Sequence, residues 1–195
     1  MALAELSLRD LLAAFASSDP TPGGGSAAAM ASAVGASLLM MVAGLPKTRS
    51  GTEGDRSALQ QVATALSEVQ RRLTEAIDED TSAYEAVIAA YRRPKATEAE
   101  QAARKAAIQH ALRGATDVPL GVMRLSATAL RHAEAVAAHG HAAAASDVGV
   151  AVALLKAGLH GARLNVEINL EGLSDAAYRE AAGAEVKKLA STTSP

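Results

Sequence analysis

Residues 27–45 read A-A-A-M-A-S-A-V-G-A-S-L-L-M-M-V-A-G-L and contain no charged side chain. Unbranched alanine, leucine and methionine favour a helix, and a soluble helix that is apolar on all sides must be enclosed by others. Gly44 and Pro46, at the end of the stretch, are typical of a helix terminus. The stretch therefore predicts a buried, alanine-rich central helix over residues 26–45.

The remaining sequence divides into further helical segments, so we expect an all-α fold. It would be an antiparallel bundle of about six to seven helices, in a single domain over residues 1–195. Apolar periodicity, caps and prolines predict the other helices over residues 8–17, 55–93, 97–138, 146–170 and 174–189. Within these, residues 114–118 should interrupt or kink the fourth helix, ahead of Pro119 in a new first turn. The alternating pattern of 164–170 is strand-like, but a lone strand has no partner, so helix is favoured. Residues 47–54 should form a mobile loop, and the tail 191–195 should be disordered.

Composition excludes several classes of function. The chain has no cysteine, which rules out disulfides, thiolate nucleophiles and cysteine-based metal sites. A net charge of −2 with few aromatics argues against nucleic-acid binding and favours a small-molecule partner. Residues 27–45 approach the length of a membrane span, but no aromatic belt or basic flank accompanies them. We therefore expect a cytoplasmic protein with no membrane partner.

A glycine-rich run, Thr21-Pro22-Gly23-Gly24-Gly25-Ser26, precedes the central helix. Consecutive glycines are kept where φ is positive or where another group must approach closely. Free N–H groups and the positive end of the dipole meet at a helix N-terminus, which makes a potential cradle for an anion or a ligand oxygen. The alternative is an ordinary glycine-rich turn before a buried helix.

One acidic residue interrupts the apolar seam of the helix over 55–93. The seam recurs at three- and four-residue steps, and Asp80 occupies a position where the repeat requires an apolar residue. A carboxylate on a buried seam must be paired, protonated or functional, so Asp80 is a candidate catalytic residue, with a structural ion pair as the alternative. His139 and His141 bring no further ligand at suitable spacing, and no metal site is predicted.

Six segments of the chain form an ordered set of motifs. They are T-P-G-G-G-S-A-A-A at 21–29, D-E-D-T-S-A-Y at 78–84, R-R-P-K at 92–95, T-D-V-P-L at 116–120, S-D-V-G-V-A at 146–151 and N-V-E-I-N-L at 165–170. Together they resemble the cyclodeaminase/cyclohydrolase family, which comprises the C-terminal domain of formiminotransferase-cyclodeaminase and the standalone methenyltetrahydrofolate cyclohydrolases.

The resemblance implies an all-helical homodimer that binds folate, with Asp80 as the catalytic residue. The positions it implies for the substrate pocket are Gly23, Gly24, Gly25, Ser26, Ser146, Asp147 and Asn165. The implied reaction is hydrolysis of 5,10-methenyltetrahydrofolate to 10-formyltetrahydrofolate, with no cofactor beyond the tetrahydrofolate carrier. The alternatives are a formiminotetrahydrofolate cyclodeaminase and a non-catalytic helical dimer that binds folate or a protein partner.

The chain also departs from the family pattern. His141 follows Gly140 where many members have asparagine, Arg93 replaces a usual leucine, and residues 47–51 differ from a lysine-rich segment. These departures leave the contacts to the pterin and to the glutamate tail open. Arg49 and Lys95 are candidates for binding the tail carboxylates, although exposed basic residues are commonly only solvated.

Overall fold

The computed structural model describes residues 2–191, which are helical with short connections. The elements in chain order are η1 (Leu3–Glu5), α1 (Leu8–Phe15), α2 (Gly24–Ala43), α3 (Glu53–Tyr91), α4 (Glu98–His139), η2 (Ala142–Ala144), α5 (Ala145–Glu171) and α6 (Ala176–Ser191). Apart from an isolated bridge between Thr48 and Gly140, no strand pairing occurs in this part of the chain. The all-α prediction is confirmed.

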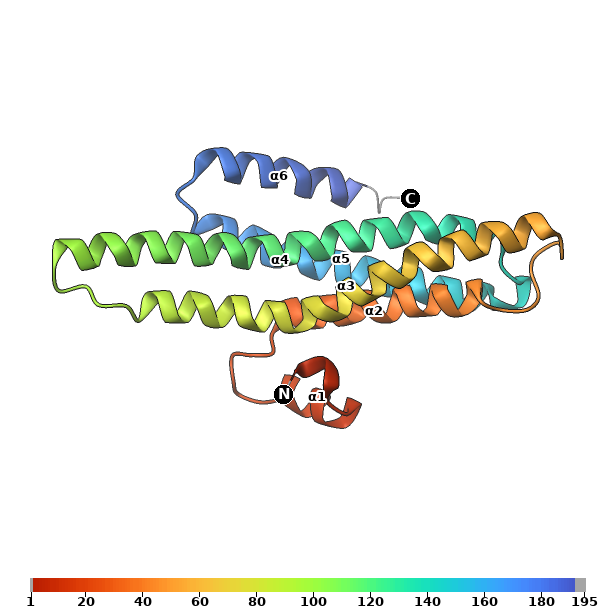
Figure 1. The fold of residues 1–195 in the computed structure, drawn as a ribbon, viewed down its shortest axis with the longest axis horizontal. Coiled ribbons are helices and arrows are strands. Elements are labelled where there is room, and N and C mark those ends of the chain that lie inside the picture. Colours follow the sequence, from red (N-terminus) through yellow and green to blue (C-terminus); the bar gives the residue numbers. More distant parts are fainter. Residues whose placement is uncertain (1, 192–195) are drawn as a thin grey trace.

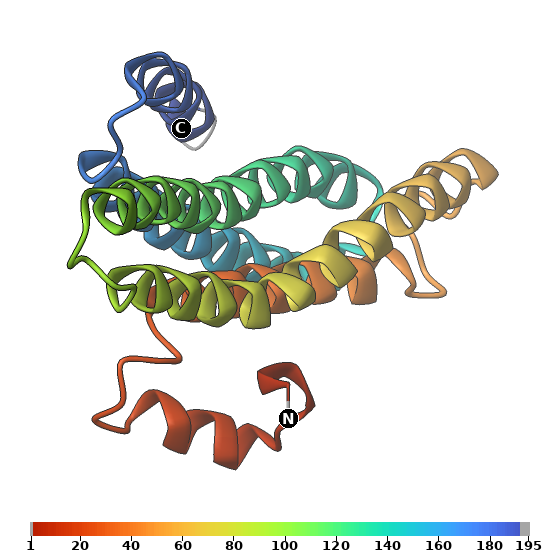
Figure 2. The same cartoon turned by 60° about the vertical axis from the view of Figure 1, so that its left-hand side comes forward.

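Helices α2 to α5 form an elongated antiparallel bundle. The long helices α3 and α4 run side by side, with α2 and α5 packed along them (Figure 1). Helix α1 lies apart from the bundle on one side, and α6 lies on the opposite side beside α4 and α5 (Figure 2). The segment that includes η1 is tied to α3, because the amides of Leu3 and Ala4 donate to the Asp78 carboxylate.

Small residues allow α2 and α5 to pack closely. A Cβ on Gly158 would lie 2.0 Å from Ser32 Oγ, and one on Gly35 would lie 2.8 Å from the Ala151 carbonyl oxygen. Ser32 Oγ also lies 2.7 Å from Ser126 Oγ, which links α2 to α4 in the core. The predicted small-residue helix is therefore central, and much of its small-residue surface serves contacts within one chain.

Two helical segments are long and apolar enough to cross a membrane by length and composition alone. They are Gly24–Ala43, with 56% of an 18-residue apolar window buried within the chain, and Ala142–Glu171, with 28% of such a window buried. More than half of the window in α2 is thus buried, as in a core helix. In the second segment, most residues of the window are not buried within the chain.

Helix α3 begins earlier than predicted, and the preceding loop is tied down. The N-cap is Thr52, whose Oγ1 accepts from the Asp55 amide, so Asp55 is not the cap. Arg49 N–H donates to the His139 carbonyl at 2.8 Å, beside the Thr48–Gly140 bridge. These bonds connect the loop to the end of α4, and the predicted mobility of residues 47–54 stays a prediction.

The predicted break at 114–118 is absent, because α4 continues through Pro119. Proline has no N–H for the carbonyl four residues earlier, which here belongs to Ala115. Asn169 of α5 supplies the missing donor, with Nδ2 2.7 Å from Ala115 O. A side chain from a neighbouring helix thus replaces the lost backbone bond, and local sequence rules could not reveal it.

The C-terminal helices also differ from expectation at their starts. Helix α5 begins at Ala145, so Ser146 and Asp147 lie in its first turn and not at its cap. Before α6, Asp175 Oδ1 accepts from the Tyr178 amide, whereas the Ser174 hydroxyl donates to Gln109. Residues 164–170 are helical, as predicted. Ser191 ends α6, and the rest of the tail predicted to be disordered lies outside the described residues.

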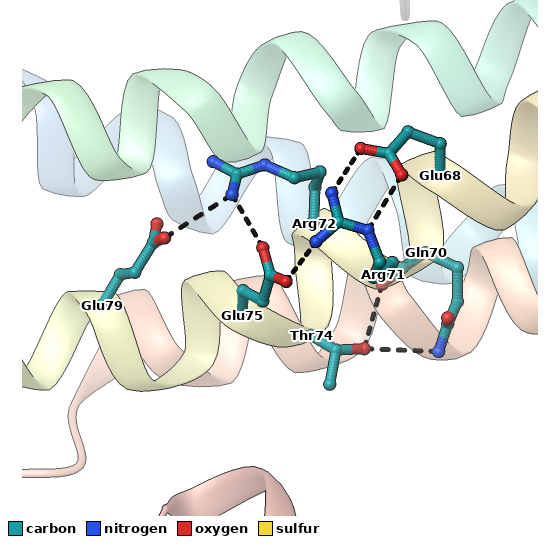
Figure 3. A network of polar contacts seen from close by, with 7 residues as sticks. All are labelled: Glu68, Gln70, Arg71, Arg72, Thr74, Glu75 and Glu79. Carbon is teal, nitrogen blue, oxygen red and sulfur yellow. Dashed lines mark hydrogen bonds and ion pairs between the residues drawn. The ribbon is translucent and has the colours of Figure 1, made fainter.

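The exposed surface of α3 carries a ladder of ion pairs. Arg71 pairs with Glu68 and Glu75, and Arg72 pairs with Glu75 and Glu79 (Figure 3). These side chains are solvent-exposed, and such pairs stabilise a helix only slightly. None of them involves Asp80, the residue next to Glu79.

Candidate functional site

A cavity of about 310 Å³ lies where the N-terminus of α2 meets the middle of α3. The glycines 23–25 form one wall, and Asp80 and Tyr84 of α3 lie beside them. Asn165 and Asn169 of α5 contribute polar groups, while Val87 and Leu112 supply apolar surface. A mostly apolar pocket with a few converging polar groups is the usual form of a small-molecule site.

Asp80 is held by one oxygen and left free at the other. Its Oδ2 accepts from the Ser26 amide at 2.9 Å and lies 3.2 Å from the Ser26 hydroxyl oxygen. That hydroxyl is fully buried and also donates to the Ile77 carbonyl at 2.8 Å. Oδ1 has no hydrogen-bond partner among residues 2–191. The carboxylate is thus fixed in position with one oxygen available to a ligand or water.

Gly25 makes room for this carboxylate. A Cβ at position 25 would lie 2.0 Å from Asp80 Oδ1, a distance at which something must move. At Gly24 a Cβ would make only ordinary contact, 3.7 Å from Asn165 Nδ2. None of these three glycines has a positive φ, so close approach explains Gly25 in particular.

At the start of α2, where the sequence indicated a potential cradle for an anion or a ligand oxygen, one amide binds the protein's own Asp80 carboxylate. Asp80 takes the amide of Ser26, one of the first-turn N–H groups that a helix leaves unpaired. The amides of Gly24 and Gly25 have no partner within the described chain. They remain available as donors at the cavity wall.

Burial raises the pKa of the Asp80 carboxyl above its ordinary value. Desolvation disfavours the charged form, and the hydroxyl and amide of Ser26 oppose it only in part. A carboxylate with a raised pKa is a better proton acceptor than a free one, and shifts of this kind are common at catalytic groups.

The two asparagines of α5 are oriented by main-chain carbonyls. Asn165 Nδ2 donates to Gly161 O at 2.9 Å, and Asn169 Nδ2 donates to Ala115 O at 2.7 Å. Each side-chain oxygen is left without a partner inside the described part of the chain. The cavity is therefore lined by two side-chain amides with unpaired oxygens as well as by the free glycine N–H groups.

The structure brings together most of the predicted site residues. Asp80, Gly23, Gly24, Gly25 and Asn165 line the cavity, and Ser26 supports Asp80 from behind.

Ser146 and Asp147 do not share this cavity within one chain. Asp147 is eighteen residues before Asn165 on the same helix, about 27 Å away at 1.5 Å per residue. Arg49 is also elsewhere, because its guanidinium donates to the Ala137 carbonyl near the end of α4. His139 donates to Asp55 and has no contact with the site.

Among the wall residues that the sequence predictions did not name as site residues are Tyr84 and Asn169, which carry polar groups. Tyr84 lies one turn after Asp80, and its ring is partly exposed at the cavity. The four-residue spacing from Asp80 placed it on the same face and could have identified it. Asn169 had a weaker signal, since its role depends on Pro119 of another helix.

The chain matches the family model described as formiminotransferase-cyclodeaminase over residues 7–188. It is 43% identical over 173 residues to the methenyltetrahydrofolate cyclohydrolase of Methylorubrum extorquens, covering 89% of this chain and 83% of that protein. It is 35% identical to the formimidoyltransferase-cyclodeaminase of Dictyostelium discoideum, covering 96% of this chain but 34% of that longer protein.

A solved structure shares the fold. The crystal structure of formiminotetrahydrofolate cyclodeaminase from Thermotoga maritima superposes with a TM-score of 0.86 at 28% identity. The match covers 97% of this chain and 90% of the other. The matches in sequence and structure agree, and the chain belongs to the formiminotransferase-cyclodeaminase family.

Proposed function

We propose that this protein hydrolyses 5,10-methenyltetrahydrofolate to 10-formyltetrahydrofolate. The observation that carries the proposal is the Asp80 carboxylate, which lines the cavity, is anchored through Oδ2 by Ser26 and has no hydrogen-bond partner at Oδ1 within residues 2–191. Similarity to the cyclohydrolase of Methylorubrum extorquens over most of both chains supports this choice of substrate.

The substrate carries an amidinium-like positive charge around its one-carbon bridge. An anionic Asp80 beside this bridge would stabilise the cation and accept a proton from an attacking water. The water oxygen bonds to the bridge carbon, and the bond from that carbon to N5 then breaks as the carbonyl forms. N5 takes up one proton and the second is released, so the cation and water yield neutral 10-formyl product and one proton.

The environment of Asp80 suits this role. Its raised pKa makes the carboxylate a stronger base than a solvent-exposed aspartate. Tyr84 and the apolar side chains of Val87 and Leu112 offer surface to a flat heteroaromatic ring. The free amides of Gly24 and Gly25 provide donors for oxygen atoms of the ligand.

Cyclodeamination of 5-formiminotetrahydrofolate is the second candidate. It is favoured by the structural match to the cyclodeaminase of Thermotoga maritima. In this reaction N10 attacks the formimino carbon, the ring closes and ammonia leaves. Protonated Asp80 would donate to the departing nitrogen, and the raised pKa of this residue makes that form more accessible.

Parallel assays with purified protein test both reactions. The first follows loss of methenyltetrahydrofolate absorbance against buffer, and the second follows ammonia release from the formimino substrate. We expect the protein to increase the rate of the first reaction over buffer more than that of the second. No acceleration over buffer in either assay would contradict catalysis and leave the non-catalytic binding dimer, whereas acceleration of only the second would establish the cyclodeaminase.

We also propose that the protein is a homodimer. Apolar side chains are exposed along one stripe of α2 and one of α5, which pack together. They are Val34, Met41, Val150, Leu164 and Ile168, and Ile168 is 66% exposed. Exposed apolar side chains on two adjacent helices are typical of an interface, and their position on a helix pair suits a second copy of the chain.

Light scattering coupled to size-exclusion chromatography tests the dimer. We expect a mass of two chains for the wild type and of one chain for a Leu164→Glu, Ile168→Glu variant. Leu12→Glu, which changes an exposed leucine of α1 outside the stripes, should retain the wild-type mass. A wild-type mass of one chain at micromolar concentration would contradict the proposal.

A further inference from the structure

A second groove continues from the cavity that contains Asp80. It has a volume of about 470 Å³ and shares three wall residues with that cavity: Pro20, Thr21 and Tyr84. The groove then follows the surface of α3 past Ile88 to Arg92. A ligand seated at Asp80 can therefore extend along α3 without leaving the surface of this chain.

Arg92 supplies a cation at the far end of this groove. It has no hydrogen bond from its guanidinium and no ion pair within residues 2–191, unlike Arg71 and Arg72 on the same helix. Glu85 lies on the same wall two turns earlier, where it is closer to Tyr84. The groove thus presents an aromatic ring, then one acceptor, then a free guanidinium.

This order matches the chemistry of the proposed substrate beyond its one-carbon bridge. A folate continues from the bridge into a benzoyl ring, then an amide N–H, then the carboxylates of glutamate. Arg92 is twelve residues after Asp80, about 18 Å along the helix, and its side chain can reach back along the groove. Arginine is the side chain best shaped to bind a carboxylate with two hydrogen bonds.

We propose that Arg92 binds a carboxylate of the folate glutamate tail and gives the site its preference for substrates that carry this tail. The inference rests on the proposed function for the identity of the ligand. It assigns to Arg92 the role for which the sequence offered Arg49 and Lys95.

The neighbouring Arg93 provides a matched control. It lines a different cavity, between α3 and α4, whose other wall residues are mainly alanines with His110. That cavity shares only Ala83 with the cavity of Asp80. The Arg93 cavity shares Ala89 with the groove, but Arg93 itself does not line the groove. Substitution of Arg93 therefore removes the same charge from the same turn of the chain without removing a wall residue of the groove.

The test compares ligands with and without glutamate. Calorimetry measures the Kd of 5-formyltetrahydrofolate and of 5-formyltetrahydropteroate, which lacks the glutamate, for wild type, Arg92→Gln and Arg93→Gln. We expect wild type and Arg93→Gln to bind the folate at least about tenfold more tightly, as charge-assisted hydrogen bonds warrant. In Arg92→Gln this preference should disappear, through weaker binding of the folate only.

Kinetics separate this inference from the proposed function. KM for 5,10-methenyltetrahydrofolate should rise about tenfold in Arg92→Gln, with kcat unchanged, because the guanidinium is distant from the reacting atoms. Preferential binding of the glutamate-bearing ligand without turnover would refute the proposed function and support the role of Arg92. Equal binding of both ligands by the wild type, an intact preference in Arg92→Gln, or no binding at all would overturn the inference.

Discussion

Two aspartates of α3 have nearly the same local partners and different surroundings. Asp80 Oδ2 contacts the amide and hydroxyl of Ser26 at 2.9 and 3.2 Å, and Asp55 Oδ2 contacts the amide and hydroxyl of Ser50 at 2.7 and 2.6 Å. The difference lies at Oδ1. In Asp55 it accepts from His139 at 2.9 Å, whereas in Asp80, which lines the cavity, it has no hydrogen-bond partner among the described residues 2–191.

This difference reverses the direction of the pKa shift. The Ser50 hydroxyl, followed by His139 and the Ser50 amide, holds the pKa of Asp55 well below its usual range despite its burial. At Asp80 the two Ser26 donors are more distant and no counterpart of His139 is present within the described residues, so burial raises the pKa. A carboxylate whose oxygens are both paired fixes a loop, and one with a free oxygen can carry out proton transfer.

The largest expected effect is the loss of kcat when the charge of Asp80 is removed, with removal of the Asp55 charge as the control. Asp80→Asn should lower kcat for methenyltetrahydrofolate hydrolysis by about 10² to 10⁴, the usual contribution of a general base. Asp55→Asn should retain wild-type kcat, because Asp55 is distant from the cavity. Steady-state assays of both variants check this, and an Asp80→Asn variant as fast as wild type would refute the assigned role.

Gly25→Ala should displace the Asp80 carboxylate without altering its charge. Its new methyl group would meet Oδ1 at 2.0 Å in the present arrangement, and displacements of about 1 Å can cost about 10²-fold in rate. Gly24→Ala is the control, because its methyl group has room. Equal kcat/KM in the two variants would show that the fit between Gly25 and Asp80 is unimportant for catalysis.

The thermal stability of the protein should depend on the charge of Asp55 and not on that of Asp80, which reverses their expected effects on kcat. The depressed pKa of Asp55 means that its charged form stabilises the fold at pH values above the unfolded pKa of about 3.9. Asp55→Asn should therefore lower the Tm at pH 7, and the difference from wild type should shrink as the pH falls below this range. Asp80→Asn should not lower the Tm at pH 7, because the raised pKa of Asp80 shows that folding disfavours its charge. Thermal unfolding followed by circular dichroism across pH measures the Tm of both variants. A lower Tm for Asp80→Asn with an unchanged Tm for Asp55→Asn would contradict this prediction.

The hydrogen bond from Asn169 to the Ala115 carbonyl can be tested together with Pro119, which leaves that carbonyl without a backbone donor. Asn169→Leu leaves the Ala115 carbonyl without its donor, which should cost about 1 to 3 kcal/mol. Adding Pro119→Ala restores a backbone N–H for that carbonyl and should recover part of the loss. Chemical denaturation of the two single variants and the double variant measures this coupling. Strictly additive losses would show that Asn169 does not compensate for the proline.

The smallest expected effect is a shift of the pH profile. Activity that requires ionised Asp80 rises with pH through the pKa of this group, and the Ser26 hydroxyl lowers that pKa. Ser26→Ala should therefore move the acid limb of kcat/KM to higher pH. Ser50→Ala, which removes the equivalent hydroxyl from Asp55, should leave the limb in place. A limb that moves to lower pH in Ser26→Ala would contradict the assignment.

The sequence predicted features that follow from local periodicity. The interrupted seam identified Asp80, and the charge-free stretch identified α2 as the central helix, because both depend on residues close together in the chain. Features that depend on distant partners were missed or misplaced. Asn169 bonds the carbonyl that Pro119 leaves without a backbone donor, and Arg49 of the 47–54 loop bonds the main chain of His139. The separation of Asp147 from Asn165 follows from the unbroken length of α5.

The most direct test of the role of Asp80 is a crystal structure with 5-formyltetrahydrofolate bound. We expect the folate to occupy the cavity beside Gly25, with the one-carbon group facing Asp80 Oδ1. The separation should be hydrogen-bonding distance, about 2.6 to 3.2 Å, directly or through one water. A folate bound with its one-carbon group turned away from Asp80, or bound outside this cavity, would contradict the role assigned to Asp80.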